Sequence, residues 1–374
     1  MKTLRGPLAP LYLLYFLVRA ASAASVVTPT VPELAVTPLP GLSGLPGYCA
    51  LSFSPALPPV TAVSLEGAYG TLSASLLRPE ARAVLSSPLA EVRPARRVSA
   101  APAPMPVPRR MGGSGSTLSG DVRFVDFPSR SLGETRRVAI YLPPGYDASK
   151  DRYPVLYVQD GQNVFDAATS FGGVEWGIDE ACEGLIASGR MRPAIVVAVY
   201  NGGQKRLEEY TPVPDAQEGG GGAARYASFL IEELKPYVDA SLRTRSDARS
   251  TAVLGSSLGG LLALHLSLTR PDVFGAAAAL SPSLWWSDEE IIRRMAATTP
   301  QARARLWIDM GTQEGGAPQE NVRRLWEMAT ALQKRGWVRD GDLSVHEIPG
   351  GGHNEAAWAG RVAYVLRYLF PPLP

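Results

Sequence analysis

The chain has 374 residues, of which 45% are hydrophobic and 19% charged, and its formal net charge is +2. This composition supports at least one sizeable core, and the near-neutral charge argues against binding nucleic acid or an acidic partner through bulk electrostatics. The two cysteines, Cys49 and Cys182, lie in segments of very different composition. We therefore expect neither a disulfide framework nor a zinc site.

The first 24 residues have the pattern of a signal peptide. Lys2 and Arg5 precede an apolar run over residues 8–18, and small residues at 21–23 offer a cleavage site. This run is too short to span a membrane, and no later segment is long and apolar enough to do so. We expect export to the periplasm or the outside of the cell, with the cytoplasm as the alternative.

Composition changes sharply near residue 118. Fifteen of the 33 prolines fall between Pro29 and Pro108, and the first aspartate of the chain is Asp121. A segment rich in proline and alanine, with few aromatic residues, lacks the side chains that build a core. Residues 25–117 are therefore predicted to be a disordered linker, and residues 118–374 a globular domain.

In the globular part, apolar strand-like segments alternate with amphipathic helical segments. Strands are expected at residues 121–127, 135–144, 153–161, 194–200, 251–255, 276–283, 304–312 and 343–350. Helices are expected at residues 175–189, 224–242, 258–270, 321–336 and 355–370. This alternation predicts one doubly wound α/β domain, in which helices cover both faces of a mostly parallel sheet.

Residues 255–259, Gly-Ser-Ser-Leu-Gly, fit the pattern G-x-S-x-G. An apolar strand precedes the motif and a helix follows it, which is the context of a nucleophile on a sharp strand-to-helix turn. The glycine spacing makes Ser257 the predicted nucleophile. The alternative is a glycine-rich packing corner with no chemical role.

A nucleophilic serine needs a base, and the chain has three histidines. His265 lies more than two helical turns beyond Ser257, and His346 lies inside a predicted strand. His353 lies in a glycine-rich loop after the last strand, where it can reach the same sheet edge as the serine. We therefore predict His353 as the base, by elimination and by position.

An acidic residue between the serine and the histidine is expected to orient the imidazole. Glu314, in the loop after a strand, is favoured over Asp309, near the end of that strand. The oxyanion of an acyl-transfer reaction needs two backbone amides. Leu258 is predicted to supply one, and Gln162, which follows Gly161 in an early turn, the other.

Several side chains near the predicted catalytic edge are candidates for contact with substrate. The aromatic residues expected to line an acyl or aryl pocket, or alternatively to cap the core, are Trp176, Tyr210, Trp285 and Trp286. Arg206 can bind an acidic group of a substrate or pair with Glu208 or Glu209, and we favour the pairing.

Longer motifs resemble the esterase D and enterochelin esterase-like branch of the α/β-hydrolases, over about residues 121–370. Three of them are YPVLYVQDGQNVFD, GSSLGGLLAL and PGGGHNEAAW. The resemblance implies an eight-stranded α/β-hydrolase core without metal or organic cofactor. It also implies Ser257 as nucleophile, His353 as base and Glu314 as the third member.

The same branch includes siderophore, feruloyl and acetyl-xylan esterases, S-formylglutathione hydrolases and acyltransferases, so fold and mechanism transfer better than substrate. We expect a serine esterase that cleaves small-molecule or carbohydrate esters through an acyl-enzyme intermediate. The alternatives are an acyltransferase of the same fold and a non-catalytic binding module.

Overall fold

The computed structural model describes residues 115–297 and 302–372 in full, and the backbone of six short strands before them. The chain forms two compact units, residues 1–102 and 103–374. The predicted signal peptide lies outside the described residues, as does most of the predicted linker.

The strands of the first unit pair in antiparallel fashion, β1 with β2, β2 with β5, and β3 with β4. They are β1 (Leu34–Pro38), β2 (Cys49–Phe53), β3 (Ala62–Gly67), β4 (Gly70–Ser75) and β5 (Ala83–Val84). They lie within residues 25–117, and the assignment of that segment as a linker stays a prediction.

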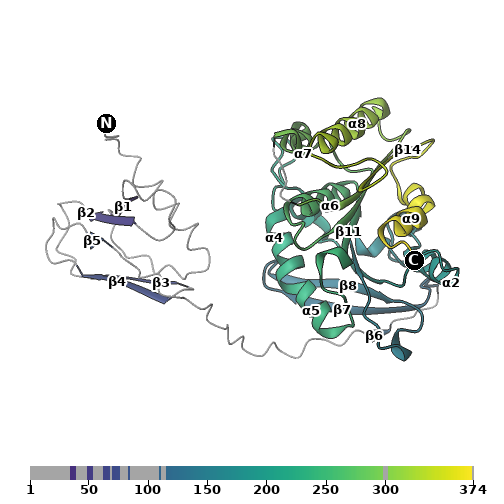
Figure 1. The fold of residues 1–374 in the computed structure, drawn as a ribbon, viewed down its shortest axis with the longest axis horizontal. Helices are drawn as coiled ribbons and strands as arrows, with labels where there is room; N and C mark the ends of the chain where they lie inside the picture. Colours follow the sequence, from purple (N-terminus) through teal and green to yellow (C-terminus); the bar gives the residue numbers. More distant parts are fainter. Residues whose placement is uncertain are drawn as a thin grey trace. The chain divides into compact units, whose positions relative to one another are not determined.

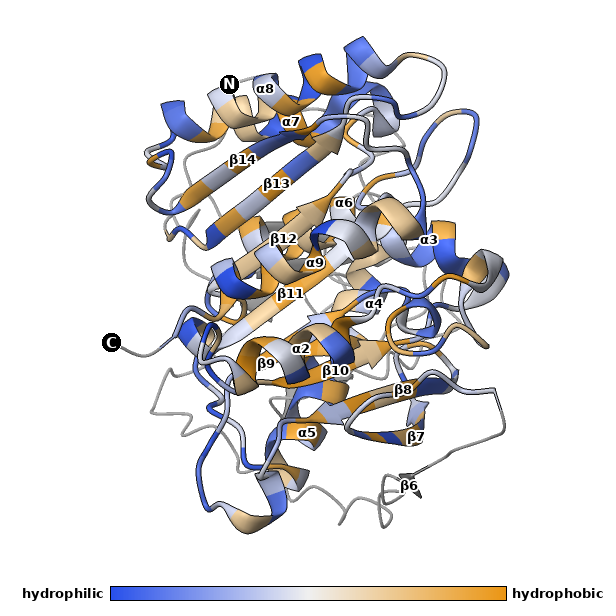
Figure 2. Cartoon of the chain, turned by 90° about the vertical axis from the view of Figure 1, so that its right-hand side faces the viewer, coloured by the Kyte–Doolittle hydropathy of each residue, from blue (hydrophilic) through white to orange (hydrophobic). Residues whose placement is uncertain are grey.

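The second unit contains a nine-stranded sheet (Figure 1). Its strands follow the order β14-β13-β12-β11-β9-β10-β8-β7-β6 (Figure 2). The six strands from β14 to β10 run parallel, whereas β8 and β7 add antiparallel pairings at one side. The strands are β6 (Arg109–Arg110), β7 (Asp121–Ser129), β8 (Glu134–Leu142), β9 (Val155–Val158), β10 (Ile195–Val199), β11 (Thr251–Ser256), β12 (Ala276–Leu280), β13 (Arg305–Gly311) and β14 (Leu343–Ile348).

The central strands are apolar along their whole length because helices cover both faces of the sheet. Every residue of β9, β10, β11 and β12 is buried. On one face, α2 (Ile178–Ala187) and α9 (Glu355–Leu369) pack together over the sheet (Figure 2). This arrangement confirms the predicted α/β-hydrolase fold.

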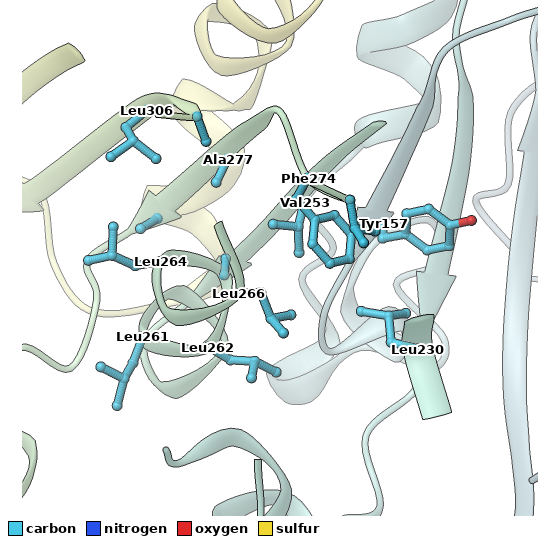
Figure 3. Close-up of a cluster of buried hydrophobic side chains, with 14 of the residues drawn as sticks. Tyr157, Leu230, Val253, Leu261, Leu262, Leu264, Leu266, Phe274, Ala277 and Leu306 are labelled. Atoms are coloured by element: carbon cyan, nitrogen blue, oxygen red, sulfur yellow. The ribbon is translucent and has the colours of Figure 1, made fainter. Parts of the chain in front are cut away.

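The opposite face holds the larger core. It is covered by α4 (Ala223–Ser228), the π-helical η5 (Phe229–Leu234), α5 (Lys235–Ser241), α6 (Leu258–Thr269), α7 (Trp286–Ala297) and α8 (Pro318–Lys334). Leucines of α6 lie in one buried cluster with Val253 of β11 and Ala277 of β12 (Figure 3). Because α6 follows β11 directly and is buried, its first turn is held at the carboxyl edge of the sheet. Within the described residues, no helix has the length and apolarity needed to cross a bilayer.

Candidate active site

The turn between β11 and α6 holds Ser257 in a strained conformation. Its φ is 55° and its ψ is −123°, a region that residues other than glycine seldom occupy. The neighbouring Gly255 permits the turn, because a Cβ there would lie 2.3 Å from the carbonyl oxygen of Gly259. The backbone N–H of Ser257 donates to the carbonyl of Leu280, 3.0 Å away. The turn therefore presents the serine side chain at the carboxyl edge of the sheet.

The structure brings Ser257, His353 and Glu314 into one chain of hydrogen bonds. His353 Nε2 lies 2.9 Å from Ser257 Oγ, and His353 Nδ1 lies 2.8 Å from Glu314 Oε2. His353 comes from the loop between β14 and α9, and Glu314 from the loop after β13. The histidine side chain is 39% exposed and the glutamate side chain 2%, so the acid is shielded while the imidazole reaches the surface.

The second carboxylate oxygen of Glu314 is also held. Glu314 Oε1 accepts hydrogen bonds from the backbone N–H of Gly311 at 2.6 Å and from Ser281 Oγ at 2.5 Å. These bonds fix the carboxylate plane, so Oε2 is left directed at the imidazole.

Asp309, the alternative acid, has other partners. Arg361 donates to both of its oxygens, Nη2 to Oδ1 at 2.9 Å and Nε to Oδ2 at 3.1 Å. Trp307 Nε1 donates to Oδ2 at 2.8 Å. Burial raises the pKa of Asp309, and the Arg361 charge opposes this rise. Asp309 therefore belongs to a buried ion pair behind the site.

Ser281 links the two carboxylates and was not identified from the sequence. Its hydroxyl donates to Glu314 and lies within hydrogen-bond distance of Trp358 Nε1 (3.0 Å) and Arg361 Nη2 (2.6 Å). Its φ of 44° is unusual for serine. The only sequence signal is its place directly after the apolar strand β12, which does not distinguish it from an ordinary loop serine.

The early turn predicted to carry an oxyanion donor is η2 (Gly161–Asn163). A Cβ at Gly161 would lie 2.6 Å from the carbonyl carbon of Ala198, so only glycine fits this close backbone contact. Among the described residues, no protein acceptor is found for the backbone N–H of Gln162 or of Leu258. Both amides are therefore unengaged by protein and can donate to a bound group.

Asp160, which precedes this turn, is held by partners distant in sequence. Arg206 Nε and Nη2 donate to its two carboxylate oxygens at 2.7 and 2.8 Å. The backbone N–H of Asp160 donates to the hydroxyl of Tyr210 at 3.1 Å. The expected pairing of Arg206 with Glu208 or Glu209 was wrong. Glu209 is not available to Arg206, because it forms a buried ion pair with Arg136 of β8.

Three of the four aromatic residues predicted to line a substrate pocket are buried, which corrects the prediction for those three. The exposed fractions are 1% for Trp176, 0% for Tyr210 and 2% for Trp286. The Trp176 ring packs edge-on against Trp358, and Trp286 Nε1 donates to a backbone carbonyl, that of Val213. The rings of Trp176 and Trp286 are therefore packed inside the protein.

The fourth of these aromatic residues, Trp285, is exposed near the site, with an exposed fraction of 45%. It lines a pocket of about 190 Å³ beside His353 and Glu314, together with Pro282 and Met310. Within the described part of the chain, one group of carboxylates could hold a metal ion, Glu175, Asp179 and Glu180. None of these three belongs to the Ser257–His353–Glu314 chain.

Comparison with known proteins places the chain in a family. Residues 129–369 match the family model named Esterase. The endo-1,4-beta-xylanase/feruloyl esterase of Xylanibacter ruminicola is 27% identical over 258 residues, which cover 67% of this chain and 31% of that relative. The ferri-bacillibactin esterase BesA of Bacillus subtilis is 26% identical over 234 residues, which cover 55% of this chain and 77% of the relative.

Among solved structures, the IroE-like serine hydrolase from Shewanella oneidensis superposes with a TM-score of 0.55 at 25% sequence identity. The match covers 67% of this chain and 80% of that one. The chain spans less than a third of the length of the xylanase/feruloyl esterase. The resemblance predicted from the motifs is confirmed: the chain belongs to the Esterase family and is a carboxylic ester hydrolase.

Proposed function

We propose that the chain cleaves carboxylic esters through a covalent acyl-enzyme formed on Ser257, with His353 as general base and Glu314 as the acid that orients it. One observation carries this proposal. A continuous chain of hydrogen bonds, 2.9 and 2.8 Å long, runs from the strained serine through a half-exposed imidazole to a buried carboxylate. Nucleophile, base and orienting group therefore stand in the order that acyl transfer requires.

In the first step, Ser257 Oγ attacks the ester carbonyl carbon and His353 Nε2 takes its proton. The N–H groups of Leu258 and Gln162 donate to the developing oxyanion. Glu314 accepts the hydrogen bond of Nδ1–H and stabilises the imidazolium. The imidazolium then protonates the leaving alcohol, and water activated by His353 releases the acid in a second step.

We propose that the preferred substrates are esters with an aromatic acyl group, of the feruloyl or siderophore type, with acetylated carbohydrates as the competing class. The pocket beside His353 has an apolar wall of Trp285, Met310 and Pro282. Its volume of about 190 Å³ is sufficient for one aromatic ring, since a dry cavity of about 150 Å³ binds benzene. The names of the two curated relatives, a feruloyl esterase and a ferri-bacillibactin esterase, support the same class.

The nucleophile assignment is tested by Ser257→Ala with a p-nitrophenyl acyl ester. We expect kcat to fall by at least about 10³-fold, since the remaining rate would come from the oxyanion site and binding alone. Ser256→Ala is the matched control and should keep most of the activity. Wild-type rates in Ser257→Ala, or loss of fluorophosphonate labelling only in Ser256→Ala, would contradict the assignment.

The substrate class is tested with a panel of a feruloyl ester, a catecholate siderophore and acetyl-xylan. We expect Trp285→Ala to raise KM for the aromatic esters by about 10-fold, because the wall of the pocket is lost. KM for a short acetyl ester should change little. An equal effect on both kinds of ester would contradict the proposed pocket. An added alcohol acceptor in the same assay reports any acyltransferase activity as a transester product.

We also propose that the chain is exported. The basic start, apolar run and small residues of positions 1–24 support this proposal. Expression of the full chain in a bacterial host, followed by cell fractionation and mass analysis of the mature N-terminus, tests it. Full-length protein confined to the cytoplasm would contradict it.

A further inference from the structure

Three carboxylates cluster at the start of α2, apart from the Ser257–His353–Glu314 chain. Glu175, Asp179 and Glu180 each offer one oxygen, and these oxygens all lie within 4.8 Å of one another. Two ligands of one Ca²⁺ ion can be at most about 4.6 to 5.2 Å apart, because Ca²⁺–O distances are about 2.3 to 2.6 Å. Mg²⁺, with distances of about 2.0 to 2.1 Å, requires a tighter set. Separations within 4.8 Å are therefore compatible with Ca²⁺ ligands.

Burial sets this cluster apart from an ordinary group of surface acids. Asp179 is fully buried, with an exposed fraction of 0%. Its Oδ1 atom and Oε2 of Glu175 are both shielded from solvent, and neither has a hydrogen-bond partner among the described residues. A buried carboxylate oxygen without a partner costs free energy, so it indicates a positive group that completes its environment.

The charges around the three carboxylates also favour a bound positive group. Asp166, also buried, adds a fourth negative charge that acts on Glu175. Among the described residues, none of the four acids forms an ion pair with an arginine or lysine. The amino end of α2 favours Asp179 and Glu180 through the helix dipole, and Ser119 donates to both. These donors do not account for the free oxygen of Glu175.

We propose that Glu175, Asp179 and Glu180 bind one Ca²⁺ ion, which neutralises the cluster and holds the loop before α2 in place. The competing explanation is a proton shared between neighbouring carboxyls, because burial raises the pKa of Asp179 to about 9. A proton satisfies at most one oxygen pair, whereas Ca²⁺ takes six to eight oxygen ligands and accommodates all three side chains with water.

The position of the cluster gives such an ion a structural role. Ser119 joins the segment that enters the domain to Asp179 and Glu180. Trp176, directly after Glu175, donates its backbone N–H to the carbonyl of Asn163 in η2 at 2.8 Å. An ion at Glu175 would therefore fix both the entry segment and the turn that carries Gln162, without taking part in ester cleavage.

The test uses the full chain, treated with EDTA and then titrated with CaCl₂. We expect the Tm to rise by about 5 °C or more at a calcium concentration about 100-fold above the Kd, because the ion binds only the folded state. Tb³⁺, which replaces Ca²⁺, should show luminescence sensitised by the nearby Trp176, and Ca²⁺ should displace it. Mg²⁺ at the same concentration should raise the Tm by less than half as much.

The variant Glu175→Gln/Glu180→Gln should lose the calcium-dependent shift and the Tb³⁺ luminescence. Asp179→Asn, which keeps the shape of the buried side chain, should stay folded in EDTA and also lose the response. Glu327→Gln, an exposed acid on α8, is the control and should respond as the wild type does. The proposal is overturned if calcium leaves the wild-type Tm unchanged, if Mg²⁺ acts equally, or if the double variant still responds.

Discussion

Asp309 and Glu314 lie five residues apart at the end of β13, and both side chains are buried. Asp309 is paired with the guanidinium of Arg361, which is itself only 5% exposed, inside the sheet-helix core. Glu314 is paired with the imidazole of His353, which is 39% exposed. Two neighbouring buried acids thus face opposite kinds of partner, one permanently charged and one able to gain and lose a proton.

The kind of partner separates an acid suited to a structural role from an acid suited to chemistry. An arginine is always charged, so the ion pair of Arg361 with Asp309 is permanent. The attraction between the two charges offsets the free-energy cost of burying them. In the proposed mechanism, His353 becomes charged during acyl transfer, so the carboxylate of Glu314 would matter most when the imidazolium forms. Ser281, hydrogen-bonded to Glu314 and Arg361, couples the two pairs.

Among substitutions of the two acids and their partners, Glu314→Gln should have the largest effect, and that effect should be on kcat. We expect kcat for a p-nitrophenyl ester to fall by about 10³-fold or more, because a neutral amide neither fixes the tautomer of His353 nor stabilises its charged form. The Tm should change little in comparison. Glu320→Gln, an exposed acid on α8, serves as the control, and wild-type activity in Glu314→Gln would break the proposed contrast.

The second effect, on stability rather than rate, should come from Asp309→Asn. We expect the free energy of unfolding to fall by about 3–5 kcal/mol, because Arg361 is left as a buried charge without its partner. Urea unfolding measures this loss. Adding Arg361→Met to remove the orphaned charge should recover part of it. If Asp309→Asn instead left stability unchanged and abolished kcat, the roles of the two acids would have to be exchanged.

Ser281→Ala should have a smaller effect on both kcat and the free energy of unfolding. The Ser281 hydroxyl contacts Glu314 of one pair and Arg361 of the other. Loss of one buried hydroxyl should lower the free energy of unfolding by about 1–2 kcal/mol. We expect kcat to fall by about 10-fold as Glu314 loses one of its two fixing donors. Activity and urea unfolding of the same preparation separate the two effects. Ser267→Ala is the matched control, since Ser267 is a buried serine of α6 whose hydroxyl donates to the carbonyl of Leu264.

The smallest effect should be on the pH dependence of stability, and it concerns His265, which lies beside Arg294. Burial, followed by the charge of Arg294, lowers the pKa of His265 to about 4. Folded His265 therefore stays neutral between pH 6.5 and 4 while the unfolded chain binds a proton, so stability falls as pH falls through this window. We expect a loss of about 1 kcal/mol between pH 6.5 and 5.5. Urea unfolding of His265→Gln across that range should show a flatter profile, and an unchanged slope would contradict the assignment.

The sequence predicted the fold and the residues of the hydrogen-bonded chain because both depend on local patterns. Alternating apolar strands and helices indicate the sheet, and G-x-S-x-G between a strand and a helix indicates Ser257. Scarcity helped with the base, since only three histidines had to be compared. The loop position of Glu314 distinguished it from Asp309 at a strand end.

The sequence did not predict features that depend on contacts between distant segments. Trp176 and Tyr210 are aromatic, as residues that line pockets often are, but both are buried in the fold. Trp176 packs against Trp358, and the hydroxyl of Tyr210 accepts a hydrogen bond from the backbone N–H of Asp160. The partner of Arg206 is 46 residues away in the chain, on the turn that carries Gln162. Spacing along the chain favours Glu208 and Glu209 as partners of Arg206. It contains no information about Asp160, which the folding of the sheet brings close.

Trp285 gives the molecule a built-in optical probe. The chain has seven tryptophans, and Trp285 is the one with a large exposed fraction, 45%, among those the structure describes. A soluble quencher such as iodide should therefore reach Trp285 far more readily than the buried indoles. A molecule seated in the pocket beside His353 would shield this ring, so protection from quenching reports occupancy without any turnover and allows ligands to be ranked on the inactive Ser257→Ala protein.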